Sequence, residues 1–74
     1  MLVQVRLFAT FREGRFKEKQ MDLPCGSSLA DLLAHLKITE KEARILLVNG
    51  IAASPDHKIA PNDVISIFPP MAGG

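Results

Sequence analysis

Hydrophobic and polar residues alternate strictly at the start of the chain. Val3, Val5 and Leu7 point to one side of an extended backbone and the residues between them point to the other, which predicts a strand with one buried face. A loop is expected over residues 10–15, where a Glu-Gly-Arg sequence favours a turn. The segment 16–23 has strand character but is rich in charge, which is typical of the exposed edge of a sheet.

Residues 29–36 have the hydrophobic periodicity of an α-helix. Ser28 stands directly before this segment, and Asp31 follows Ser28 by three residues, a spacing close to that of a capping box. The spacing of three or four residues predicts one amphipathic helix whose leucines face the core. The leucines of this stripe are Leu29, Leu32, Leu33 and Leu36.

Two further extended segments occupy the second half of the chain. The apolar run 45–48 leads into an Asn-Gly dipeptide at 49–50, which is a strong signal for a tight hairpin turn, so residues 51–52 are expected to pair back. The last strand is predicted over 64–68. Two prolines at 69–70 end it, because proline has no N–H to donate to a sheet.

The order strand, strand, helix, strand, short strand, strand predicts an α+β fold. One main helix would cover one face of a mixed sheet of about five strands, and the first and last strands would lie side by side in its middle. We expect residues 1–70 to form this domain and residues 71–74 to form a flexible Gly-Gly tail.

Composition narrows the class of protein. The 74 residues are 47% hydrophobic, carry a net charge of +1 and include one cysteine. This length is enough for one domain but not for a multidomain enzyme. A single cysteine cannot form an internal disulfide, which excludes a disulfide-stapled fold. The small net charge gives no overall basic surface for binding nucleic acid. The N-terminal residues do not resemble a signal peptide, and no apolar run approaches the length of a membrane helix. We therefore expect a cytoplasmic protein that acts with partner proteins.

The sequence ends in Gly73 and Gly74, which form a slim and flexible pair because glycine has no Cβ. A terminal carboxylate is ionised at neutral pH and is a poor electrophile. It can, however, attack the α-phosphate of ATP, and a sulfur or nitrogen nucleophile can open the acyl-adenylate that results. Two glycines keep such a carboxylate free of neighbouring bulk, although small residues also occur at ends that have no function.

Several segments resemble a known family. The sequence Phe-Pro-Pro-Met-Ala-Gly-Gly at 68–74 closely resembles the end of MoaD, and residues 7–13 resemble the end of its first strand and the following loop. The turns at 48–50 and 62–64 fall where MoaD and ThiS carry similar turns. The chain is therefore similar, over essentially its whole length, to the MoaD and ThiS family of ubiquitin-like sulfur carriers, and is nearest to MoaD. The resemblance implies the β-grasp fold.

The resemblance also implies a function. In this family, an adenylyltransferase akin to ubiquitin-activating enzymes uses ATP to activate the terminal glycine, and a cysteine desulfurase or rhodanese-type donor supplies sulfur. Gly74 would then carry a thiocarboxylate (1-thioglycine), and Gly73 would keep the approach slim. The chain would be the non-catalytic small subunit of molybdopterin synthase, beside a MoaE-like large subunit, in molybdenum or tungsten cofactor biosynthesis. It would bind no metal and no cofactor of its own.

An outward-facing patch is predicted from the alternation. If Leu7 and Ile67 face the helix, Phe8 and Phe68 face outward on neighbouring strands, and Leu47 joins them if its neighbours point inward. We predict that these three side chains bind partner proteins; the alternative is that the two phenylalanines only pack on each other. Contact with the partner is also expected for Pro70, Met71 and Ala72.

Other reactive residues are not assigned a role. Cys25 stands in a predicted turn near the helix start, and no base can be placed beside it from the sequence. His35 and His57 lack the ligand spacing of a zinc site. The sequence has no glycine-rich phosphate loop of the Walker type, so a partner must bind the ATP.

Other functions stay open at this stage. The chain could carry sulfur for thiamine or another thiolation pathway, as ThiS does. It could also be a ubiquitin-like modifier whose Gly74 forms isopeptide bonds with lysines, or a plain binding module with an inert tail.

Overall fold

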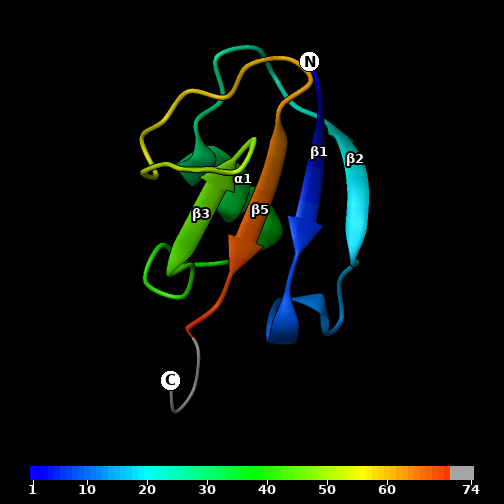
Figure 1. Ribbon diagram of the computed structural model, residues 1–74. Coiled ribbons are helices and arrows are strands. Elements are labelled where there is room, and N and C mark those ends of the chain that lie inside the picture. The colour runs from blue at the N-terminus through cyan, green and yellow to red at the C-terminus, as the bar shows by residue number, and fades with distance from the viewer. Residues whose placement is uncertain (71–74) are drawn as a thin grey trace.

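A five-stranded mixed sheet with one α-helix across one face makes up residues 1–70, the part of the chain that the computed structural model describes (Figure 1). A short 3₁₀ helix, η1, lies between the first two strands. The elements in chain order are β1 (Leu2–Leu7), η1 (Ala9–Arg12), β2 (Glu18–Asp22), α1 (Leu29–Leu36), β3 (Ile45–Val48), β4 (Ile51–Ala52) and β5 (Val64–Phe68).

The strands lie in the order β2-β1-β5-β3-β4. β1 and β5 pair in parallel at the centre of the sheet, and the other neighbours are antiparallel. The prediction that the first and last strands lie side by side is therefore confirmed, as is the α+β, β-grasp fold. Because β1 and β5 are parallel and adjacent, their C-terminal ends lie at the same end of the sheet (Figure 1).

The core lies between the sheet and α1. Alternate residues of the central strands face the helix and are almost fully buried, with Leu7, Ile65 and Ile67 at 0% exposure. Leu36 of the predicted leucine stripe is only half-buried against this core. The buried hydrophobic residues of this core are Val3, Val5, Leu7, Phe11, Leu23, Leu29, Leu32, Leu33, Ile38, Ala43, Leu46, Val48, Ile59, Ile65 and Ile67.

Both ends of α1 are capped. At the start, the Ser28 hydroxyl accepts a hydrogen bond from the Asp31 N–H at 3.2 Å, and the Ser28 N–H donates to the Asp31 carboxylate at 3.0 Å. This is the predicted capping box. At the other end, Lys37 adopts a left-handed conformation with φ of 60°, and Arg15 Nε donates to the carbonyl oxygen of Leu36 at 3.2 Å. Arg15 thereby ties the segment before β2 to the end of the helix.

Ser28→Ala is expected to lower the free energy of unfolding by about 1 kcal/mol at neutral pH, because the helix loses its N-cap acceptor. The pKa of Asp31 is lowered mainly by a hydrogen bond from the Ser28 backbone and to a smaller extent by one with the Ser28 side chain. A carboxyl group with a lowered pKa stabilises the fold above its ordinary pKa, and this contribution is lost as pH falls through the lowered value. Ser28→Ala keeps the backbone N–H that is the first cause of the lowered pKa, so the stability of both chains should fall in strong acid as Asp31 protonates. Urea unfolding at neutral and at strongly acidic pH measures both stabilities. Equal stability of the two chains at neutral pH would contradict the role of Ser28 as the N-cap.

The structure differs from the sequence prediction at two places. Residues 9–12 form a 3₁₀ helix in place of a loop; its Phe11 is buried, and Arg12 Nε donates to the carbonyl oxygen of Leu7 at 2.7 Å. A single helical turn is too short to show a hydrophobic period, so no sequence pattern predicts it. The strand predicted over 16–23 is shorter, because β2 begins at Glu18. Before it, the Lys17 carbonyl oxygen accepts one further bond, from the Leu7 N–H at 3.0 Å.

Candidate functional site

β5 leads the chain to one end of the sheet. It ends at Phe68, and the following Pro69 is buried while Pro70 is exposed. The residues predicted to carry sulfur or to enter a partner channel lie outside the described residues; they are Met71, Ala72, Gly73 and Gly74. Their roles stay predictions, and the candidate site within residues 1–70 is the surface around the end of β5.

The rings of Phe8 and Phe68 stack at this end of the sheet. Their centroids are 4.1 Å apart and their planes are 10° from parallel. Leu7 and Ile67 are register partners and fully buried, so the next residue on each chain segment faces away from α1. Both phenylalanines are half-buried. They do pack on each other, as one reading of the sequence predicted, but each keeps an exposed part on the outer face. Their binding to a partner stays a prediction.

β3 adds two aliphatic side chains to this face. Its residues Leu46 and Val48 are buried, so Ile45 and Leu47 lie on the outer face. Ile45 is the register partner of Phe68 and is 44% exposed. Leu47 was predicted from the sequence and Ile45 was not, although the same alternation places both residues outward. We define the apolar patch as Phe8, Ile45, Leu47 and Phe68.

Two arginines flank the patch at Phe8. The guanidinium carbon of Arg12 lies 5.4 Å from the ring centroid, and that of Arg6 lies 5.7 Å from it, within the range of cation–π attraction. Arg12 is held by its bond to the Leu7 carbonyl oxygen, and Arg6 faces Glu18 at 3.6 Å. The patch therefore has a cationic rim on its β1 side. Such a surface is complementary to a partner that has carboxylates around an apolar centre.

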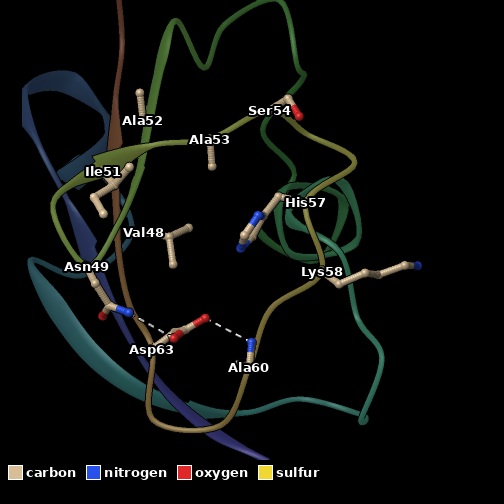
Figure 2. Close-up of a pocket in the computed structure, with 10 residues that line it drawn as sticks. All are labelled: Val48, Asn49, Ile51, Ala52, Ala53, Ser54, His57, Lys58, Ala60 and Asp63. Atoms are coloured by element: carbon tan, nitrogen blue, oxygen red, sulfur yellow. Dashed lines mark hydrogen bonds between the residues drawn. The ribbon is translucent and has the colours of Figure 1, made fainter.

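The residues that were left without a role lie elsewhere. Cys25 and His35 line a shallow cavity of about 370 Å³ beside the start of α1. His57 points into an open cavity of about 630 Å³ between β4 and the segment that leads to β5, as Figure 2 shows. Within residues 1–70, no three histidines, cysteines or carboxylates are grouped so that they could hold a metal ion. In the same residues, no helix is long and apolar enough to cross a membrane.

Comparison with known families finds one match. The model of the ThiS family matches residues 5–74 of the chain. This match therefore includes the apolar patch and both terminal glycines. Among curated proteins, none matches the chain.

Solved structures give a consistent likeness. The putative molybdopterin converting factor, subunit 1, from Pyrococcus furiosus is 30% identical over 96% of this chain and 99% of that chain, with a TM-score of 0.75. A chain in the complex of subunits 1 and 2 of the molybdopterin-converting factor from Helicobacter pylori is 28% identical over 100% of both chains, with a TM-score of 0.66. Small archaeal modifier protein 1 from H. volcanii, at 22% identity over 95% of this chain and 98% of that chain, with a TM-score of 0.78, shares the fold.

Proposed function

The chain belongs to the ThiS family, and we propose that it is a ubiquitin-like sulfur carrier that partner enzymes load with sulfur at Gly74. The observation that carries this proposal is the family match over residues 5–74, which includes Gly73 and Gly74. The fold supports it, because Phe8, Ile45 and Phe68 of the apolar patch lie at the end of the sheet where β5 ends. A partner that binds this patch would be near the residues that follow Pro70.

The proposed reaction has two steps at the Gly74 carboxylate. First, a carboxylate oxygen attacks the α-phosphate of ATP, pyrophosphate leaves, and an anhydride with AMP forms. Second, a sulfur nucleophile attacks the carbonyl carbon and AMP leaves. Hydrosulfide gives the thiocarboxylate directly, whereas a persulfide donor gives an acyl disulfide that a second thiol must reduce. In this proposal the adenylyltransferase and the sulfur donor supply the catalytic groups, and the chain supplies a slim, reachable carboxyl group.

We further propose that the sulfur is used to make molybdopterin. The support is the likeness to the two molybdopterin-converting factor proteins, one of which was solved as a complex of subunits 1 and 2. By analogy, a MoaE-like large subunit would bind the apolar patch of this chain. A carrier for thiamine or another thiolation pathway would differ only in the acceptor of the sulfur. The cytoplasm, expected from the sequence, stays a prediction.

The intact mass of the untagged protein tests the carrier role. After incubation with ATP and a lysate of its own host, the expected mass gain equals the exchange of one oxygen for sulfur, and the gain should be absent without ATP. Conjugates of higher mass on lysines would instead indicate a modifier. No gain in a lysate with demonstrably active adenylyltransferase would overturn the proposal. Copurification with a MoaE-like subunit then tests the acceptor.

A further inference from the structure

The tight turn between β3 and β4 contains a chemically reactive dipeptide. Asn49 and Gly50 both have a positive φ, 54° and 83°, as the hairpin turn requires. The space around Gly50 is open, since a Cβ built there would meet no atom within 4 Å. Glycine has no side chain of its own to screen its backbone nitrogen, and the Asn49 side chain carries a carboxamide directly before that nitrogen.

These two groups can react without an enzyme. The Gly50 nitrogen loses its proton and attacks Cγ of Asn49, so that a C–N bond forms, the Cγ–Nδ2 bond breaks, and ammonia leaves with the proton. Water then opens the cyclic imide on either side, which leaves aspartate or isoaspartate at position 49. The net change is addition of water and loss of ammonia, with no oxidation or reduction.

The folded chain holds both ends of the carboxamide. Its Nδ2 donates to Asp63 Oδ1 at 3.0 Å, and its Oδ1 accepts from the Val64 N–H at 2.9 Å. Asp63 is only 8% exposed, and its other oxygen accepts from the Ala60 N–H at 2.8 Å. Figure 2 shows the line of contacts from Asn49 through Asp63 to Ala60. The carboxamide cannot turn towards the Gly50 nitrogen unless both of its bonds break.

We propose that Asn49–Gly50 is a site of spontaneous deamidation and that Asp63 and Val64 restrain the reaction in the folded chain. Either product would place a carboxylate against the buried carboxylate of Asp63, where the native donor stood, and like charges at short range repel. Isoaspartate would also lengthen the backbone in a two-residue turn and disturb the pairing of Val48 with Ile51. Deamidation would therefore weaken the hairpin at the end of β3, in which Leu47 of the apolar patch pairs with Ala52. The other patch residues, Phe8, Ile45 and Phe68, lie where β5 ends.

The test compares deamidation rates of the full chain at mildly alkaline pH, by peptide mapping and isoaspartate assay. Asp63→Ala is expected to deamidate about tenfold faster at position 49 than the wild type, the effect of losing one hydrogen bond of ordinary net strength. Ser28→Ala, which removes only the side-chain hydrogen bond at the start of α1, is the control. All three chains are compared at urea concentrations that give equal unfolded fractions, so that global unfolding contributes equally.

A second comparison needs no variant that might fail to fold. Wild-type chain in native buffer should deamidate at least about tenfold more slowly than wild-type chain in strong denaturant, since both restraining bonds are then lost. Equal rates in the two conditions would overturn the proposal. So would a rate for Asp63→Ala that matches that of Ser28→Ala at the same unfolded fraction. Neither result depends on the sulfur-carrier function.

Discussion

A chain that lacks Gly74 is expected to show no sulfur loading at all. In the proposed reaction, both steps take place at the terminal carboxyl group. The deletion moves that group back by one residue, about 3.5 Å along an extended backbone. Misplacement by about 1 Å can already cost about 100-fold in rate. Intact mass after incubation with ATP and the loading enzymes measures the result, and the deleted chain should keep its unmodified mass.

The fold supplies the control for this deletion. Within residues 1–70, every member of the buried hydrophobic core lies between Val3 and Ile67, so we expect the thermal unfolding midpoint to stay unchanged. Gly73→Val is the companion variant, since it keeps the terminal glycine but adds a branched side chain to the approach. Its loading is expected to fall about 100-fold while its fold is kept. Normal loading of the deleted chain would refute the assignment of Gly74, whatever the outcome for Gly73→Val.

The architecture could be predicted because three local patterns have clear physical meanings. Alternation at Val3, Val5 and Leu7 fixes which face of β1 is buried, since a shift by one residue would turn that face to solvent. The leucine stripe fixes the inner face of α1, and Ser28 fixes where the helix starts. With one helix and few strands, packing the helix on one face of the sheet buries these faces together.

Other features depend on contacts that a sequence pattern does not contain. The η1 turn exists because Phe11 reaches the core and Arg12 binds the Leu7 carbonyl oxygen, and both contacts require β1 to be in place first. The stacked geometry of Phe8 and Phe68 depends on the register of β1 and β5. The sequence predicted that both rings lie on the same face, but the register decides whether they touch.

Ile45 shows a different kind of omission. Its outward position follows from the same alternation as that of Leu47, so the information was present in the sequence. What the sequence lacks is the pairing of Ile45 with Phe68, which makes it a neighbour of the aromatic stack rather than one more exposed apolar residue. Isolated apolar residues are common on protein surfaces, and only the register distinguishes this one.

Phe8→Asp is expected to weaken binding of the large subunit or the adenylyltransferase by about 100-fold, the loss typical of a central aromatic residue in an interface. The substitution removes a stacked ring and places a carboxylate in the apolar patch. The fold should tolerate it, because Phe8 is only half-buried and the guanidinium groups of Arg6 and Arg12 already lie beside its ring. Isothermal titration with the purified partner measures the affinity, and thermal unfolding of the variant checks the fold.

Ile51→Asp is the matched control for charge and lost apolar area. Ile51 is 73% exposed and lies outside the patch, in β4, so its substitution should leave affinity almost unchanged. Loss of affinity in both variants would mean that added negative charge, rather than the patch, weakens the complex. Unchanged affinity of a folded Phe8→Asp chain would show that the patch is not the docking surface. That result would leave the role of Gly74 intact, because the patch is proposed to hold the partner, whereas the terminal carboxyl group is proposed to react.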